Sequence, residues 1–145
     1  MNTISFQLEQ EGYYSIGFRI RKSNHLYING KLNKTKALFL IDTGASNTCV
    51  DSNAQDDFKI LSKNLKSKAS GAGTNNMDAA SSKNNQLQLG IFKINDVNLI
   101  VLDLSHVNIA LEAHGLPTVH GIIGSDLLKK HGAIISYPEQ LLFIK

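Results

Sequence analysis

The sequence has a single cysteine, Cys49, among its 145 residues. One cysteine excludes an internal disulfide and any metal site built from several thiolates. Cys49 stands between a threonine and a valine, and a lone cysteine in such surroundings is more often a small buried hydrophobic residue than a nucleophile. We therefore predict that Cys49 belongs to the core.

Long hydrophobic runs are also lacking. The longest uninterrupted run is about five residues, whereas a membrane-spanning helix needs about 20. The first residues, Met1 to Gln7, have neither the basic start nor the apolar stretch of a secretory signal. We expect a protein without membrane segments that stays in the cytoplasm, provided that no leader has been removed.

A strong excess of one charge is absent as well, since the net charge is +3. Basic residues gather at 19–36 and again at 59–68, but without the dense patch and the aromatic partners of a nucleic-acid-binding face. We predict solvent-exposed strands and helices there and no nucleic-acid partner. With 42% hydrophobic and 19% charged residues, the chain has the size and composition of one globular domain, residues 1–145.

Alternating polar and apolar residues dominate the first third of the chain and predict β-strands. Residues 4–8 are expected to form a half-buried strand, and residues 14–21 a second one. The next strand leads into Asn29-Gly30, the dipeptide most typical of a two-residue hairpin turn. The five apolar residues 37–41 then predict a buried strand.

The rest of the chain is predicted to be mostly strand with short helices. A helix is expected near 53–62, where apolar residues recur at helical spacing, although the same residues would suit a strand. Further helices should begin at Ser105 and at Ser125 or Asp126. The other predicted strands are residues 87–89, 92–94, 97–104, 121–123, 133–137 and 141–144, with turns at 95–96 and 138–140. The fold class is therefore mostly β with two or three short helices.

Residues 67–86 are the least hydrophobic part of the chain. A segment of this composition adds little to a core. It is either a flexible surface loop or an exposed hairpin, tipped by residues 71–73 or by residues 75–76. Because a structureless loop of this length is unusual inside a compact domain, a functional lid is a third interpretation.

The buried strand ends at Asp42, which is followed by Thr43, Gly44, Ala45 and Ser46. A carboxylate at the edge of a core either caps a turn or is placed for chemistry. Gly44 lets backbone amides approach the carboxylate, which holds it in plane and favours its charged form. Thr43 adds a hydroxyl, and Ser46 is close enough in sequence to donate to the outer carboxylate oxygen. The segment is predicted to orient Asp42.

A second acid of this kind is missing, because the motif at Asp42 is not repeated and Asp103 and Asp126 lie in other contexts. One carboxylate cannot serve as general base and general acid in a single hydrolytic step, whereas two that share one proton can. The symmetric solution is a homodimer in which Asp42 meets the same residue of a second copy.

Residues 40–46 and the later segment Gly-Ile-Ile-Gly-Ser-Asp-Leu-Leu at 121–128 together resemble the retropepsin-like aspartic peptidases, and most of all their bacterial members. These peptidases are single-lobe, homodimeric relatives of pepsin. Order and spacing agree over roughly residues 13–145. The resemblance implies the closed-barrel acid-protease fold and an endopeptidase in which two Asp42 carboxylates activate a water, with no metal and no cofactor. The implied substrate is an extended polypeptide segment.

The resemblance also implies roles for the neighbours of Asp42. Thr43 would reach across the dimer axis, and Gly44 would let the loop approach the carboxylate. Ala45 and Ser46 would complete the hydrogen bonds of the loop.

Other implied roles lie further along the chain. Gly124 and Asp126 would be structural residues beneath the active site, with Asp126 holding the last helix in place. The flap would lie at about 67–86 and close over a substrate that pairs with it through backbone hydrogen bonds. Its tip, and the substrate-binding part of it, would be Gly71, Ala72, Gly73 and Thr74.

Two alternatives to an active protease are open. The same fold can serve as a dimeric peptide-binding or regulatory module with little turnover, because a fold does not determine a function. The polar flap region, which lacks a tyrosine, favours this alternative. Asp42 can also be a turn-capping residue of an unrelated β-barrel. A metal site is not expected, because His106, His114 and His120 have no carboxylate ligand at helical spacing.

Overall fold

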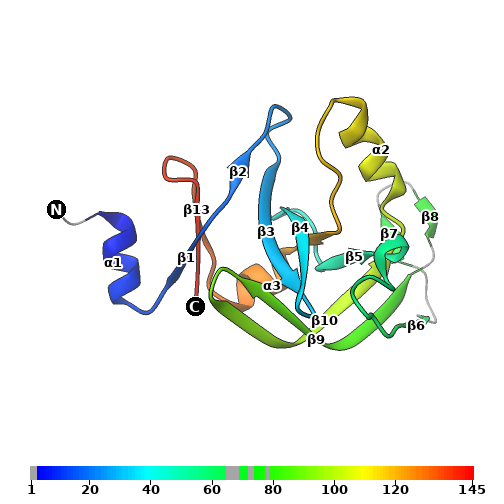
Figure 1. The fold of residues 1–145 in the computed structure, drawn as a ribbon, viewed down its shortest axis with the longest axis horizontal. Helices are drawn as coiled ribbons and strands as arrows, with labels where there is room; N and C mark the ends of the chain where they lie inside the picture. Colours follow the sequence, from blue (N-terminus) through cyan, green and yellow to red (C-terminus); the bar gives the residue numbers. More distant parts are fainter. Residues whose placement is uncertain (1–2, 65–68, 72–73, 78) are drawn as a thin grey trace.

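The computed structural model describes residues 3–64, 69–71, 74–77 and 79–145, and its centre is a closed barrel of six strands (Figure 1). Each strand pairs with the next one around the barrel, and the last pairs back with the first. In this order the strands are β3 (Leu26–Leu32), β4 (Thr35–Ile41), β11 (Gly121–Ile123), β5 (Cys49–Asp51), β10 (Phe92–Leu102) and β9 (Ala80–Leu89). Two short strands extend the sheet, β2 (Arg19–Ile20) beside β3 and β6 (Lys63–Asn64) beside β9.

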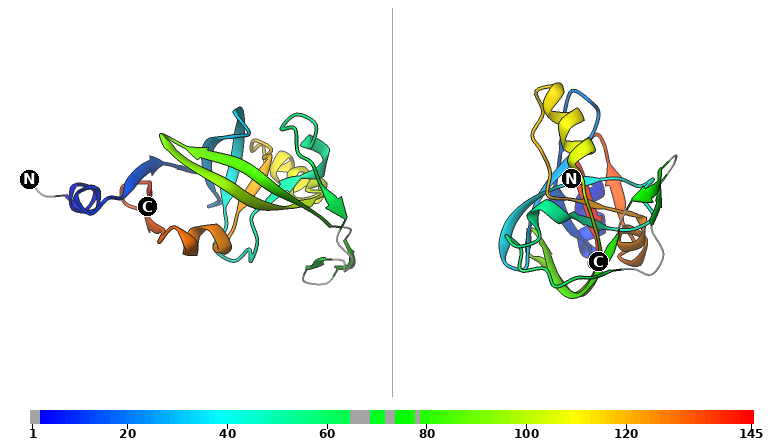
Figure 2. Two further views of the ribbon diagram at one scale, coloured as in Figure 1. Left: turned by 90° about the horizontal axis from the view of Figure 1, so that it is seen from below. Right: turned by 90° about the vertical axis from the view of Figure 1, so that its right-hand side faces the viewer.

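Two smaller sheets and three helices complete the described structure. β13 (Leu141–Ile144) lies between β1 (Tyr14–Gly17) and β12 (Ile134–Ser136), and β7 (Ala69–Gly71) pairs with β8 (Thr74–Met77). The helices are α1 (Ile4–Gln10), α2 (Ser105–Ala113) and α3 (Ser125–Lys130), with a short 3-10 turn, η1 (Ser52–Ala54). α1 and the β7–β8 hairpin project from opposite ends of the molecule (Figure 2).

The strand β11 lies between two strands that follow each other in the chain. β4 continues through the loop 42–48 into β5, and β11 inserts between them, parallel to β4 and antiparallel to β5. Gly121 makes this close approach possible, because a Cβ there would lie 2.5 Å from the Cys49 carbonyl oxygen and 3.0 Å from the Phe39 ring. The two segments that carry the sequence motifs are therefore side by side.

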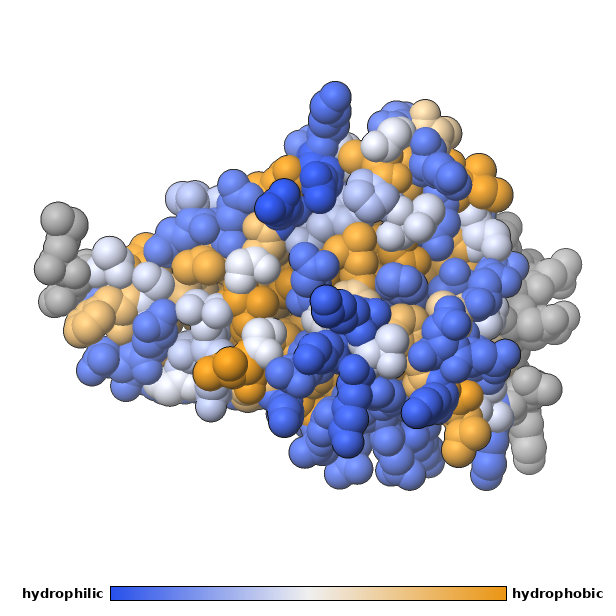
Figure 3. All heavy atoms as spheres, viewed as in Figure 1, coloured by the Kyte–Doolittle hydropathy of each residue, from blue (hydrophilic) through white to orange (hydrophobic). Residues whose placement is uncertain are grey.

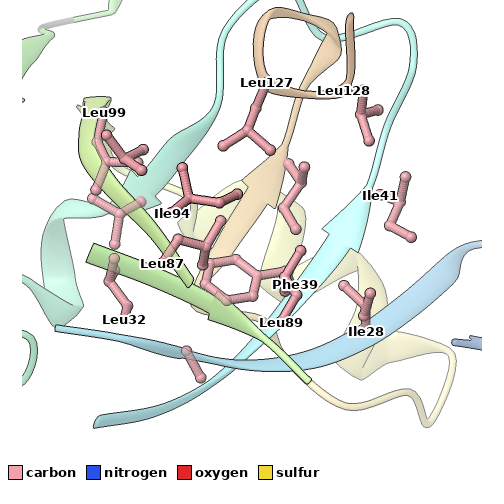
Figure 4. Close-up of a cluster of buried hydrophobic side chains, with 14 of the residues drawn as sticks. Ile28, Leu32, Phe39, Ile41, Leu87, Leu89, Ile94, Leu99, Leu127 and Leu128 are labelled. Atoms are coloured by element: carbon pink, nitrogen blue, oxygen red, sulfur yellow. The ribbon is translucent and has the colours of Figure 1, made fainter. Parts of the chain in front are cut away.

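Side chains of alternate residues fill the barrel. Ala37, Phe39 and Ile41 of β4 point inward, and Phe39 lies in the middle of the cluster (Figure 4). Leu127 and Leu128 of α3 belong to the same core, so α3 packs against the barrel just below the loop that follows β4.

A second apolar layer covers the outer face of β3 and β4. It consists of buried residues from β3, from β4 and from the α2 segment, which comprises α2 and the residues that follow it up to 119. These residues are Tyr27, Leu40, Leu111, Leu116 and Val119. The Tyr27 hydroxyl donates to the Pro117 carbonyl oxygen over 2.9 Å, and the Asn108 side-chain amide exchanges two hydrogen bonds with the backbone of Val119. These contacts fix the α2 segment against the outside of the barrel.

The prediction of a mostly β protein with short helices is confirmed, and so are the buried strand at 37–41 and the helices that begin at Ser105 and Ser125. Cys49 is buried, as predicted. The strand predicted at 4–8 is wrong, because these residues form α1. The Thr3 side chain accepts a hydrogen bond from the Phe6 amide and so caps the helix. The strand was predicted from the alternation of apolar and polar residues, which assumes that the apolar ones are buried. Ile4 and Phe6 are instead exposed.

The two predicted turns at 29–30 and 95–96 lie inside strands. β3 runs through Asn29-Gly30 to a two-residue turn at Asn33-Lys34, where both residues have positive φ (49° and 73°). Gly30 instead allows a close approach of β9, since a Cβ there would lie 2.7 Å from the Gln88 carbonyl oxygen. Residues 95–96 form an irregularity within β10, and the hairpin between β9 and β10 turns at Gly90.

The helix predicted near 53–62 is also wrong. The segment contains η1 followed by turns, and Lys59 has a φ of 53°, which a continuous helix does not allow. Leu61, one of the apolar residues with helical spacing, is 86% exposed. Ala54, Phe58 and Ile60 are all buried in the barrel core, and a path of turns brings these three side chains inward where a regular helix does not form.

The low-hydrophobicity segment at 67–86 contains the β7–β8 hairpin and the first part of β9. The hairpin pairs Ala69 with Met77 and Gly71 with Thr74. Asn75-Asn76, one of the two candidate tips, therefore lies within β8. Ala72 and Gly73 of the other candidate tip fall outside the described residues.

Candidate active site

Asp42 follows the last residue of β4, and backbone hydrogen bonds fix its position. Its amide donates to the Ile123 carbonyl oxygen of β11 over 3.0 Å, and its own carbonyl oxygen accepts from the Ala45 amide over 3.1 Å. The Gly44 amide donates to the carboxylate Oδ1 over 2.9 Å. A backbone donation to the carboxylate was predicted from the sequence, and it is present here.

The loop around Asp42 rests on the start of α3. The Ser125 amide donates to the Ala45 carbonyl oxygen over 2.7 Å. Gly124 packs so tightly beneath the loop that a Cβ would lie 2.8 Å from the carbonyl oxygens of Ala45 and Asn47. The β11–α3 junction thus supports the loop by direct backbone contact.

Thr48 connects the loop to α3, and the sequence analysis missed it. Its hydroxyl accepts from the Gly124 amide over 3.0 Å and donates to Asp126 Oδ1 over 2.8 Å. The Thr48 amide donates to the same carboxylate oxygen over 2.9 Å. Thr48 is 1% exposed, so its hydroxyl needs such partners. The available signal was a threonine directly before the apolar residues of β5.

The tip of the loop is open to solvent in the single chain. Asp42, Thr43, Gly44 and Ser46 are exposed, and Ala45 is half-buried. Among the hydrogen bonds of the described residues, Asp42 Oδ1 accepts from Gly44 and not from Ser46, so the predicted Ser46 donation does not occur within this protomer. A buried strand therefore presents an oriented carboxylate at the surface.

A small groove begins beside Thr43 and has a volume of about 220 Å³. It passes between α3 and β12, and its lining is mostly apolar. The residues that line it are Thr43, Ser125, Leu128, Lys129, Gly132, Ala133 and Ile135. The exposed loop and the three-stranded sheet are thus joined by one continuous apolar surface.

Two other ionisable groups near the barrel have altered pKa values. Burial raises the pKa of the Cys49 thiol to about 11, so the thiol stays protonated at neutral pH and is a poor nucleophile. The pKa of Asp103 is lowered, first by hydrogen bonds from the Ser105 side chain and backbone and then by one from Asn53. Asp103 lies just before α2, where it satisfies the free amide of Ser105.

Metal ligands are not grouped in the described part of the chain, where no set of three or more His, Cys, Asp or Glu side chains converges. No helix within the same residues has the length and apolar character needed to cross a membrane. Of the predicted flap residues, Gly71 and Thr74 lie opposite each other in the β7–β8 hairpin.

Comparisons with known proteins agree with this geometry. A family model described as aspartyl protease matches residues 26–127, which include the Asp42 loop, β11 and the start of α3. A search of curated protein sequences gives no significant match.

Three solved structures share the fold. A retropepsin-like aspartic protease from Rickettsia conorii has a TM-score of 0.57 and 21% identity, covering 92% of this chain and 88% of that chain. The retroviral protease-like domain of Ddi1 from Leishmania major has a TM-score of 0.60 and 17% identity, with coverages of 83% and 88%. The EIAV protease in complex with the inhibitor HBY-793 has a TM-score of 0.57 and 18% identity, with coverages of 81% and 98%. These likenesses confirm the predicted retropepsin-like fold.

Proposed function

The chain belongs to the aspartyl protease family, and from that premise we propose that it is an aspartic endopeptidase with Asp42 as its catalytic residue. The observation that carries the proposal is the exposed carboxylate of Asp42, held by the Gly44 amide at the end of a buried strand. A turn-capping aspartate makes the same hydrogen bond, and the match of the aspartyl protease family to residues 26–127 favours the catalytic role.

A homodimer would complete the site. Two Asp42 carboxylates that face each other cannot both be ionised at short range, so they share one proton. The ionised carboxylate takes a proton from a water while the water oxygen bonds to the peptide carbonyl carbon. The protonated carboxylate gives its proton to the carbonyl oxygen. When the resulting diol breaks down, a proton passes to the amine that leaves.

The surroundings of Asp42 support this chemistry. The exposed Thr43 can contact the loop of the second copy, and the backbone of Ala45 is held by α3. Gly124 and Asp126 fix the loop from below, the first by its lack of a side chain and the second through Thr48. Each role concerns the position of the carboxylate, which a hydrolytic site must control within a fraction of an ångström.

The substrate would be an extended segment of a polypeptide. The β7–β8 hairpin projects from the barrel, and an extended chain can pair with such a hairpin through its backbone. In this proposal, residues 71–74 cover the segment bound at Asp42.

The test uses a fluorogenic peptide library with the wild type, Asp42→Asn, and the matched control Asp57→Asn, which changes an exposed acid elsewhere. We expect cleavage that the inhibitor pepstatin blocks, that Asp42→Asn abolishes, and that Asp57→Asn preserves. Sedimentation measures whether each variant still dimerises. Saturable peptide binding without cleavage at acid and neutral pH would favour a binding module of the same fold, and cleavage that persists in Asp42→Asn would refute the proposal.

A further inference from the structure

A second and larger cavity, with a volume of about 510 Å³, lies on the outer face of β3, β4 and β9. This volume falls within the range of small-molecule sites. Its lining combines cationic, amide and small apolar residues, namely Lys31, Lys36, His120, Asn29, Gln88, Gly30, Ala37, Leu38 and Gly90. We propose that this cavity binds a small ligand through its anionic group, a carboxylate or a phosphate.

Two lysines of the cavity lining lie opposite each other on neighbouring strands. Lys31 of β3 and Lys36 of β4 are direct partners across the antiparallel pair. Like charges in this arrangement destabilise a sheet, because their side chains lie on one face a few ångströms apart. Gln88 of β9 is the partner of Lys31 on its other side, so two ammonium groups and an amide stand in one row. An anion placed over that row removes the repulsion.

The residues that line this cavity include no aspartate or glutamate. The positive charge of the row therefore has no acidic partner within the cavity itself. In Figure 3, strongly hydrophilic side chains gather over the lower ends of β3 and β4, beneath an area of exposed apolar atoms. The surface thus offers a charged end and an apolar floor side by side.

His120 adds an imidazole ring to the lining of the cavity. Its Nδ1 accepts a hydrogen bond from the Leu38 amide over 3.0 Å, and its ring meets Phe58 edge-on with centroids 5.2 Å apart. Because Nδ1 accepts, the neutral ring carries its proton on Nε2, which can donate to a ligand. The two contacts hold the ring in one orientation, so this donor is positioned before a ligand arrives.

The backbone of Gly30 and Ala37 forms part of the hollow between these groups, because Gly30 has no side chain and the Ala37 methyl group points into the barrel. Gly90 also lacks a side chain, and Leu38 adds apolar surface. An apolar floor with a few convergent polar groups is the usual composition of a ligand site. The ligand that fits is an organic anion with a short apolar body.

The cavity is distinct from the Asp42 loop. Lys36 lies six residues before Asp42 on the same strand, which corresponds to roughly 20 Å. The α2 segment packs over Leu40 between them. Occupation of the cavity therefore does not require the catalytic carboxylate, and the inference is independent of the proposed protease activity.

Binding is tested with two named probes, glutarate and inorganic phosphate, and with neutral glutaramide as their uncharged control. The backbone amide shifts of Lys31 and Leu38 in two-dimensional NMR report occupancy at constant ionic strength. We expect saturable shifts with at least one anion and none with glutaramide. The probe that binds more tightly identifies the anionic group as a carboxylate or a phosphate.

Variants locate the site. Lys31→Met/Lys36→Met should weaken binding by about tenfold or more, since each charge-assisted hydrogen bond is worth at least that factor. Lys34→Met is the matched control, because Lys34 is exposed in the turn of the same hairpin and does not line the cavity. Equal losses in both variants would mean diffuse attraction to a lysine-rich hairpin only, and would overturn the proposal.

A stability measurement gives a second readout. Lys31→Met should raise the melting temperature of the ligand-free protein, because it removes the repulsion between the partner lysines. The anion should raise the melting temperature of the wild type and leave that of Lys31→Met/Lys36→Met nearly unchanged. A folded wild type that shows no saturable shift with either anion refutes the site.

Discussion

Thr48→Val is the substitution that most directly tests how the catalytic loop is supported. Valine has nearly the shape of threonine but lacks the hydroxyl, so the change removes two hydrogen bonds without opening a cavity. The Gly124 amide loses its acceptor, and Asp126 Oδ1 loses one of its two donors from Thr48. The Gly124 amide is buried, so water does not readily replace its acceptor, whereas Asp126 is exposed and water can replace part of its lost hydrogen bond.

The expected cost follows from these two losses. A buried amide left without a partner costs about 1–3 kcal/mol, and a hydrogen bond to a charged group contributes about 1.5–3 kcal/mol. The Thr48 amide still donates a hydrogen bond to the Asp126 carboxylate in the variant. The lower half of each range therefore applies. Because solvent screens the lost hydrogen bond of the exposed Asp126, we expect the free energy of unfolding to fall by about 1–3 kcal/mol.

The assay is equilibrium unfolding in urea, followed by circular dichroism at one fixed protein concentration because a dimer makes stability concentration-dependent. Thr35→Val serves as the control, since it removes an exposed hydroxyl at the start of β4. A double-mutant cycle of Thr48→Val with Asp126→Asn should show a coupling energy of about 1–2 kcal/mol.

The result that would refute this reasoning is a loss below about 0.5 kcal/mol with no coupling to Asp126, which is the behaviour of independent surface sites. A loss of peptidase activity with unchanged stability would show instead that Thr48 positions the loop without stabilising the fold.

Three further predictions concern other parts of the molecule. Gly121→Ala should lower the free energy of unfolding by about 1–3 kcal/mol in urea titrations, because its Cβ would overlap backbone and ring atoms. Gly17→Ala, where no atom lies within 4 Å of the new Cβ, should have little effect, and equal costs would contradict this packing argument. Cys49 should resist iodoacetamide at pH 8 in the native protein and react in urea, and its neutral buried form adds stability that is lost as the pH rises from 9.0 to about 11. The carboxyl of Asp103 should titrate below its usual pKa in NMR and return toward it in Ser105→Ala, and the stability it gives is present at neutral pH and lost as the pH falls through the lowered pKa.

Much of the barrel could be predicted from the sequence because its strands are continuous or alternating apolar runs. The short run 37–41, with its aromatic and β-branched members, favours a buried strand, and the structure buries four of its five residues. The close packing at Gly121 and Gly124 was not predicted from the residues themselves, and only the space around them in the structure shows it.

Elements that depend on a neighbour were predicted less well. Residues 4–8 alternate like a strand but have no sheet edge to pair with, so the local cap at Thr3 makes them a helix. Asn29-Gly30 has the composition of a turn, yet pairing with β9 carries the strand through it. The first segment thus follows a local cap in the absence of a neighbouring strand, whereas in the second the pairing with a neighbouring strand outweighs the local turn preference.

The sequence by itself determined that this chain is one mostly β domain, that its strand 37–41 delivers a single acid at Asp42, and that a glycine lets the backbone hold that acid. Only the tertiary structure decided that Thr48 and Gly124 support the loop, and that Lys31, Lys36 and His120 meet around one cavity. The physical reason is the range of the interactions. Apolar patterning and glycine act through neighbours along the chain, whereas these contacts join residues 76–82 positions apart or depend on strand register, which is set only when the barrel closes.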